Sequence, residues 1–373
     1  MKRLIFIASL AMLAVGCQKT EIQNEVLTPI GFSTEVGKQT RAIVQDGTYN
    51  PEQPFAVYAY GWQGGVANEN PVMNNVEISQ STSTADDGST VSKWAASVDN
   101  TVTTKYYWPN DPTTTLNFYA YSPAHSTSVS KANKNHQKLN GTISHSEEGG
   151  LTLTGYTHTN MYVDFMVADP VLNATYSDQD GTTGNATSLS SVPLTFNHRM
   201  AQIVFKVKTN EEYPNINFKL QSITLNNIKN KGDITRGVFT NATSGDATYV
   251  IYPAKAETDA NGAPGLSTDQ RIDLVIDKDV NEDSEIIPVT MIPQAFDNNQ
   301  SFTVVYKIDG TGVATETITK NFKFSDAELA PIWDANKKIT YTLTISLNEI
   351  TFAPSVATWS TDNAEGSYVD PEV

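Results

Sequence analysis

Apolar and polar residues alternate along most of this chain, and long stretches with helical spacing are missing. The clearest example is YTLTISL at 341–347, where Tyr341, Leu343, Ile345 and Leu347 share one face. A period of two is typical of a strand with one buried and one solvent-facing side. Five other windows predict strands in the same way: PFAVYAY (54–60), LNFYAYS (116–122), QIVFKVK (202–208), RIDLVID (271–277) and SFTVVYKI (301–308).

Polar, glycine-containing stretches separate these windows and predict loops. The longest are 79–90, 173–191 and 257–269. The length suits two domains, and the stretch 173–191 is the predicted boundary between them, at residues 190/191. We therefore expect an all-β chain with two mostly antiparallel β-sandwich domains in tandem.

One stretch breaks the strand pattern, SDAELAPIWDANKK at 325–338. Ser325 and Glu328 have the spacing of a capping box, which indicates the start of a helix. Pro331 should end that helix early, because proline cannot continue the hydrogen-bonding pattern. A short helical turn is therefore predicted here.

The N-terminus has the three parts of an export signal. Lys2 and Arg3 precede an apolar run of about a dozen residues, which is too short for a span of ~20 residues across a membrane. Gly16 and Cys17 follow, and a small residue before cysteine resembles a bacterial lipobox, although Ala14 holds the place where leucine is usual. We expect residues 1–17 to be a lipoprotein signal and Cys17 to carry the lipid. The alternative is an ordinary secretory signal that leaves a free thiol.

The charge balance excludes some partners. The chain has 41 acidic and 25 basic residues, a formal net charge of −16. Phosphate backbones and anionic membrane surfaces are repelled by such a chain, so no nucleic acid partner is expected.

Motifs for catalysis or metal binding are missing. The five histidines (125, 136, 145, 158 and 198) are well separated and have no cysteine partners for zinc. Asp277, Asp279 and Asn281 match the first half of a calcium loop, but Glu282 stands where glycine is needed and Pro288 where the bidentate glutamate is needed. The second calcium candidate, SDQDG at 177–181, is a shorter match than the first and is more simply a turn. We expect no enzyme, no cofactor and no metal site.

Two aromatic groups, YAYGW at 58–62 and KYYWP at 105–109, allow two interpretations. They could form a sugar-stacking platform around Trp62 and Trp108, or they could be core residues and cross-strand pairs. The first interpretation gives the alternative function, a surface glycan-binding lipoprotein of a sugar-uptake system.

A series of phrases in fixed order resembles the fimbrillin family, the Mfa-like and FimA-like type V pilus subunits of Bacteroides-type bacteria. The phrases are PIGFST…TRA (29–42), FAVYAY (55–60), YYWPND…LNFYAYSP (106–123), DFMVADP (164–170), VPLTFNHRMAQIVFKV (192–207), MIPQAF (291–296) and IWDANKKITYTLTISLNEITF (332–352). The resemblance implies two transthyretin-like domains and a structural role in a surface fibre for adhesion and biofilm formation. It also implies a lipidated precursor at the outer membrane, an arginine-specific protease, and related pilus subunits as partners.

The resemblance gives the chain an expected order of parts. Cleavage between Arg41 and Ala42 would remove residues 18–41, leaving sandwiches at 42–190 and 191–347 and an extension at 348–373. The mature subunit would pass to the cell-surface fimbrium and there meet a host or bacterial surface ligand.

Two windows read Ile-x-Phe-x-x-x-Val and could exchange places. Ile30, Phe32 and Val36 lie before the cleavage site, and Ile350, Phe352 and Val356 lie near the C-terminus. The second set is the candidate donor strand for the groove that the first would vacate. Two alternatives are that ITFAPSV at 350–356 pairs only within its own domain, and that the tail 360–373 is the donor.

Overall fold

The computed structural model describes residues 28–36, 49, 53–64, 66–67, 70–84, 90–96, 106–111, 113–124, 139–176, 188–189, 191–209, 213–252, 273–274, 288–326, 332–347 and 350–359. Strands, turns and connecting segments make up these residues, which confirms the predicted all-β fold. In these same ranges no helix has the length and apolar character needed to cross a membrane.

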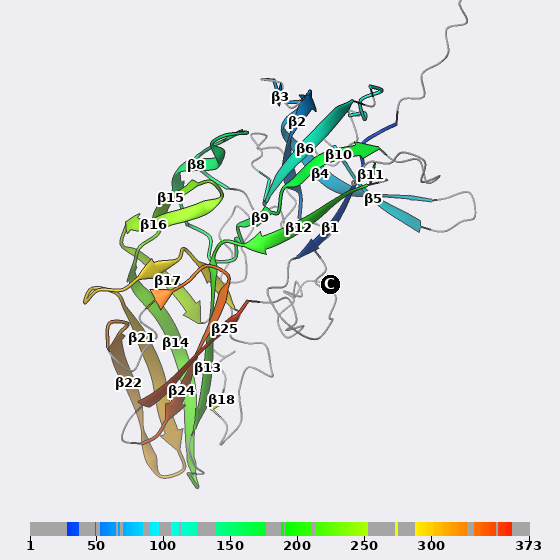
Figure 1. The fold of residues 1–373 in the computed structure, drawn as a ribbon. Helices are drawn as coiled ribbons and strands as arrows, with labels where there is room; N and C mark the ends of the chain where they lie inside the picture. The colour runs from blue at the N-terminus through cyan, green and yellow to red at the C-terminus, as the bar shows by residue number, and fades with distance from the viewer. Residues whose placement is uncertain are drawn as a thin grey trace, which may run out of the picture.

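The N-terminal half forms one sheet that closes on itself (Figure 1). Its strands, in order across the sheet, are β11 (Ser188–Leu189), β10 (Val171–Tyr176), β6 (Thr114–Ser122), β9 (Met166–Ala168), β12 (Val192–His198), β1 (Phe32–Val36), β5 (Thr90–Ala96), β4 (Met73–Thr84), β2 (Phe55–Gln63) and β3 (Val66–Ala67). Because β6 also pairs with β2, the strands β6, β9, β12, β1, β5, β4 and β2 form a closed ring. Phe55, Phe118 and Phe196 are fully buried inside it.

The C-terminal half is a sandwich of two sheets. One contains β19 (Val289–Met291), β13 (Ala201–Thr209), β24 (Lys337–Ile345) and β25 (Ile350–Thr358), and the other contains β17 (Ala247–Tyr252), β14 (Ile216–Ile228), β21 (Ser301–Gly310) and β22 (Val313–Lys323). Two short pairings complete this half: β18 (Asp273–Leu274) pairs with β14, and β20 (Gln294–Ala295) pairs with β23 (Ile332–Trp333) in a separate two-stranded sheet. Strand β21 alternates as its sequence predicts, because Phe302, Val304 and Tyr306 are buried in the core between the sheets.

Besides the ring and the sandwich, a third structural unit is a four-stranded sheet, called the third sheet below, which takes two strands from each half of the chain. It contains β7 (Thr142–Ser146), β8 (Gly150–Thr157), β15 (Lys231–Thr235) and β16 (Val238–Ser244). Its apolar face packs on the outside of the ring, where Leu153 and Ile234 share a core with Tyr58 and Phe165. Figure 1 shows this sheet where the ring and the C-terminal sandwich meet.

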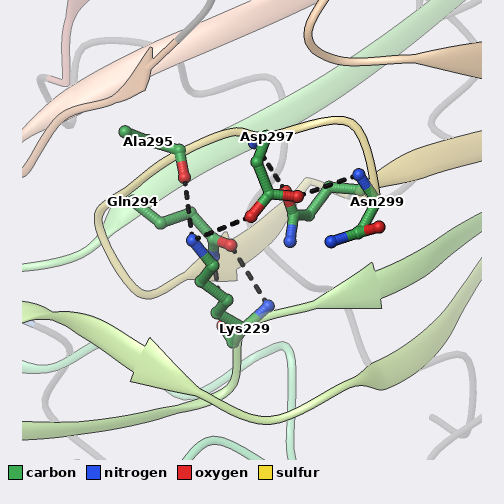
Figure 2. Close-up of polar contacts among 6 residues, drawn as sticks. Lys229, Gln294, Ala295, Asp297 and Asn299 are labelled. Carbon is green, nitrogen blue, oxygen red and sulfur yellow. Dashed lines mark hydrogen bonds and ion pairs between the residues drawn. The ribbon is translucent and has the colours of Figure 1, made fainter.

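The connection from β14 to β15 is held by a polar cluster around Lys229 (Figure 2). The Gln294 side chain is 4% exposed and pairs with the Lys229 backbone, accepting from its N–H at 3.2 Å and donating to its carbonyl at 3.1 Å. The Lys229 ammonium lies 3.7 Å from Asp297, and the Asp297 carboxylate accepts from the Asn299 backbone. Gln294 therefore supplies hydrogen bonds that a neighbouring strand would otherwise supply.

Histidine 158 joins the third sheet to the C-terminal sandwich. Its Nε2 lies 2.7 Å from the Thr290 carbonyl and its Nδ1 lies 2.9 Å from the Tyr156 hydroxyl. Because a carbonyl only accepts, Nε2 carries the proton and Nδ1 accepts from Tyr156. Burial lowers the pKa of His158 to about 4, so the ring is neutral at neutral pH.

Most of the strand windows fall in strands of the structure. The windows at 54–60, 116–122, 202–208 and 301–308 lie almost wholly within β2, β6, β13 and β21. In the window 271–277 the structure describes only β18. The loop 257–269 and both candidate calcium stretches lie outside the described residues, apart from Pro288.

Two local predictions were wrong, and a third lies mostly outside the described residues. The helical turn predicted after Ser325 falls on residues 327–331, which the structure does not describe; beyond it, 332–338 is β23, a turn and the start of β24, with fully buried Trp333 packed in the C-terminal core. The predicted loop at 79–90 begins as strand, since residues 79–84 pair with β5. Leu347 follows the end of β24 and is 43% exposed, so it does not continue the buried face.

The pairing of β12 bears on where the two expected domains meet. Strand β12 pairs with β1 and β9 in the ring, so it belongs with the N-terminal half although it follows residue 190. We propose that the boundary lies at residues 199–200, between β12 and β13. Parallel pairs also occur, between β1 and β12 and between β13 and β24. Period-two spacing does not distinguish parallel from antiparallel neighbours.

Candidate assembly site

Strand β1 completes the ring and lies between β12 and β5. Five of its residues pair in parallel with β12, whereas only Phe32 pairs with β5, opposite Trp94. Just before β1, the Ile30 N–H donates to the Tyr106 carbonyl at 2.7 Å. Without β1 the ring would be open between β12 and β5.

Three side chains of this segment fill the interior of the ring. Ile30, Phe32 and Val36 are each 6% exposed. Phe32 makes edge contacts with Phe55 and Phe118, with both pairs of ring centroids 6.0 Å apart. The side chains at 33 and 35 are exposed, so the segment has one apolar and one polar face. Its removal would leave an apolar groove with three adjacent pockets.

The segment that contains Arg41 and Ala42 lies outside the described residues, but both of its flanks are anchored in the same core. Val36 is buried on one side, and Tyr49 is 4% exposed on the other. The Tyr49 ring packs on Phe196, with centroids 4.8 Å apart, and its hydroxyl is 2.5 Å from that of Ser122. Burial raises the pKa of Tyr49, so its phenol stays protonated. A cut at Arg41 would leave Tyr49 as the anchor of the new N-terminus.

Strand β25, which contains the candidate donor residues, forms the edge of a C-terminal sheet. It pairs along its whole length with β24, from Ile350 opposite Ile345 to Thr358 opposite Lys337. Ile350 packs partly against the C-terminal core, while Val356 is 57% exposed. Phe352 pairs with Leu343, and its side chain lies outside the described part. Pro354 lacks an N–H, which an edge strand tolerates.

Just beyond β25, Trp359 is anchored in the core under the third sheet. Its ring lies flat on His198, with centroids 3.8 Å apart and planes at 7°. His198 in turn contacts the Asp164 carboxylate through Nδ1 at 2.7 Å. Trp359 is only 6% exposed. If β25 left its sheet together with the residue that follows it, this large aromatic ring would have to leave the core.

The aromatic groups considered as a sugar platform do not form one surface. Trp108 is 3% exposed inside the ring and contacts Phe118, so it is a core residue. Trp62 is half-buried and donates from its indole nitrogen to Glu147 at 3.1 Å. The platform of Trp62 and Trp108 is therefore not formed.

The histidines take several roles in packing. His158 and His198 are buried in hydrogen-bonded sites, His145 stacks on tyrosines, and His125 and His136 lie outside the described residues. The described ranges hold no cluster of three or more histidine, cysteine or acidic side chains that could bind a metal. Cys17 also lies outside the described residues.

A family model matches most of the chain, and a solved structure shows a similar fold. A sequence model described as fimbrillin-like matches residues 40–359. No curated protein sequence matches the chain. The crystal structure of a fimbrial protein from Bacteroides vulgatus is similar, with 16% identity, a TM-score of 0.50, and coverage of 82% of this chain and 93% of that one. The tip fimbrial protein Mfa3 from Porphyromonas gingivalis matches at 11% identity and a TM-score of 0.31, covering 83% and 95% of the two chains.

Proposed function

The chain belongs to the fimbrillin-like family, and on that basis we propose that it is a structural subunit of a cell-surface pilus. It is exported as a lipoprotein precursor whose Cys17 is attached to the outer membrane. An arginine-specific protease then cuts after Arg41, and the subunit joins other copies or related subunits by strand exchange. The fibre serves adhesion and biofilm formation at the cell surface.

The observation that carries this proposal is the position of β1. It is one strand of a closed ring, yet the family match begins only at residue 40, after β1 has ended at Val36. A strand that belongs to the fold but lies N-terminal to a cleavable linker is suited to removal. Its three buried side chains would define the groove that receives the next subunit.

The donor is β25 together with its flanking residues. Strand addition uses backbone hydrogen bonds for affinity and alternate side chains for specificity. Val356 is an exposed apolar side chain on an edge strand, so moving it into a groove costs the donor subunit little. Ile350 would occupy the Ile30 pocket, Phe352 the Phe32 pocket and Val356 the Val36 pocket.

Release of β25 from its own sheet opposes this exchange. The strand has to leave β24, and a complete release also extracts Trp359 from its stack on His198. These contacts keep the donor bound in the free subunit and limit premature association. Exposed unpaired strands are otherwise sites of aggregation.

The test is polymerisation of the exported precursor after treatment with an arginine-specific protease, followed by electron microscopy and N-terminal sequencing. Wild type should give subunits that begin at Ala42 and form fibres. Val356→Asp should fold normally, because the site is 57% exposed, yet should fail to polymerise since its charge would enter the groove.

Ser355→Asp is the matched control, because residue 355 is exposed and faces the opposite side of β25. It should polymerise like wild type. If Val356→Asp polymerises equally well, the donor is another segment, such as 360–373. If cleaved wild type stays monomeric while its N-terminus is Ala42, strand exchange itself is wrong.

A further inference from the structure

A cavity lies between the outside of the ring and the third sheet. Its volume is about 210 Å³, and its walls come from β2, β6, the β9–β10 connection, the β7–β8 hairpin and the β15–β16 turn. Drug-sized ligands occupy roughly 300 to 1,000 Å³, so this cavity suits a single small ring. It lies on the outer face of the ring, whereas the groove of β1 opens inside the ring.

One wall of the cavity is aromatic. His145 stacks on Tyr58, with ring centroids 5.2 Å apart and planes at 24°, and lies 4.3 Å from the ring of Tyr119. The Tyr119 hydroxyl donates to Glu147 at 2.9 Å, which fixes the ring's orientation. Such a rigid wall can pack against the C–H face of a sugar ring.

Arg199 brings a cation with an unused donor to the same cavity. It follows β12, and its Nε is buried without a hydrogen-bond partner. Asp169 lies near enough to stabilise the guanidinium charge, but the two form no ion pair among the described residues. Because the Nε itself is fully buried, a ligand oxygen in the cavity would meet the outer guanidinium nitrogens of this half-buried arginine, which lines the cavity.

Arg236 is the second cation, and its backbone conformation is unusual. Arg236 and Gly237 form the two-residue turn between β15 and β16, with φ angles of 52° and 72°. Such turns favour asparagine followed by glycine, because other side chains are strained at positive φ. Glycine is favoured at 237 by its positive φ, and a Cβ there would lie 3.3 Å from a Val167 methyl, which would have to move slightly. An arginine held in this position indicates a use for its guanidinium.

Asp169 adds an acceptor beside the two cations. It is exposed at the cavity and accepts from the Asn197 amide at 2.9 Å, which orients its carboxylate. The cavity thus combines an aromatic wall, two arginines and one carboxylate. In a chain with a net charge of −16, two arginines without an ion-pair partner in the described ranges form a local positive site.

We propose that this cavity binds one pyranose ring that carries a carboxylate, a hexuronic acid residue of an acidic glycan. The ring's C–H face packs on Tyr119 and His145. The carboxylate lies between Arg199 and Arg236, and Asp169 accepts from ring hydroxyls. The proposal is independent of the pilus assignment, because the cavity is complete in a single subunit.

The test is a ligand-observed NMR titration of the exported precursor with galacturonic acid, galactose and inorganic phosphate. A ligand of this size in a shallow site should bind with a dissociation constant of about 1 mM. Galacturonic acid should bind, and galactose and phosphate should bind at least tenfold more weakly. Equal binding of phosphate would mean a general anion site, and equal binding of galactose would mean that the arginines are not used; either result overturns the proposal.

Two variants test the cations without threatening the fold. Arg236→Asn places the preferred residue in the turn and removes the charge, so it should fold at least as well as wild type. Arg199→Gln removes a half-buried charge that forms no ion pair among the residues the structure describes. Each should weaken galacturonic acid binding about tenfold or more, the effect expected for a lost charged hydrogen bond.

Lys320→Gln is the matched control, since it removes one positive charge from exposed β22, away from the cavity. Galacturonic acid binding that is unchanged in Arg236→Asn and Arg199→Gln, or weakened equally in Lys320→Gln, would overturn the proposed site. Neither result bears on fibre formation, which is measured separately with cleaved subunits.

Discussion

Shortening Phe32 to alanine should destabilise the precursor strongly. Phe32 is 6% exposed and packs edge-on against Phe55 and Phe118. Replacing a buried phenylalanine by alanine typically costs about 3 to 5 kcal/mol, because both transfer energy and packing are lost. A folded domain is stable by only about 5 to 15 kcal/mol, so this one change removes a large part of the total.

The assay is urea unfolding of the exported precursor followed by tryptophan fluorescence. Trp94 pairs with Phe32 across β1 and β5 and is 6% exposed, so it reports on this part of the ring. The transition midpoint should fall while its slope stays unchanged, which identifies a loss of stability. Ser33→Ala is the control, since residue 33 is exposed on the same strand and should change stability by less than about 0.5 kcal/mol.

Cleavage separates two explanations of the result. After cleavage at Arg41, the Phe32→Ala and wild-type subunits are identical in sequence and differ only in the bound β1 peptide. The variant peptide should dissociate faster, so the cleaved variant should assemble no more slowly than wild type. A loss below about 1 kcal/mol in the precursor would refute the reasoning, because β1 would then contribute little to the core that it closes.

Three other changes test other parts of the molecule. Cys17→Ser should release the precursor from membranes, since two acyl chains are needed for stable anchoring, and retention after a high-salt wash would contradict this. Gln294→Leu should lower the free energy of unfolding by about 1 to 3 kcal/mol, because it leaves the Lys229 backbone unpaired. Lys229→Met removes only the exposed ion pair and should lower it by less than about 1 kcal/mol. Equal urea midpoints for these two variants would contradict this. Burial lowers the pKa of His158 from about 6.5 to about 4. The stability that the neutral ring contributes is therefore complete above pH 6.5 and falls by about 3 kcal/mol toward pH 4. The free energy of unfolding of His158→Gln should depend less on pH over this range.

The alternation of residues predicted strands well where one face is buried in a single core. Strand β21 is the best case, because each second residue from Phe302 to Ile308 faces the C-terminal core. The same alternation could not reveal which strands are neighbours. The third sheet joins β8 with β15, about 80 residues apart in sequence, and its register depends on tertiary packing.

The cavity shows a second limit of sequence reasoning. Arg236-Gly237 carries a turn signal in its glycine, but the strain at Arg236 is visible only once φ is known. Arg199 lies in the phrase NHRMAQ, where it reads as an ordinary arginine beside a strand. Only the packing of the third sheet on the ring brings these two arginines and Tyr119 together, so the site could not be predicted from spacing.

The packing of β1 inside the ring explains why cleavage alone should not open the groove. Each of Ile30, Phe32 and Val36 contributes about 1.5 to 3 kcal/mol by burial, and the pairing of β1 with β12 adds to this. A cut at Arg41 removes the covalent link but leaves these contacts in place, so β1 should stay bound as a peptide. An incoming strand can then displace it one pocket at a time, because each pocket that β1 vacates is refilled before the next opens. The groove is never fully exposed to water on this route, and a donor whose side chains do not match the three pockets in order should fail to complete the exchange.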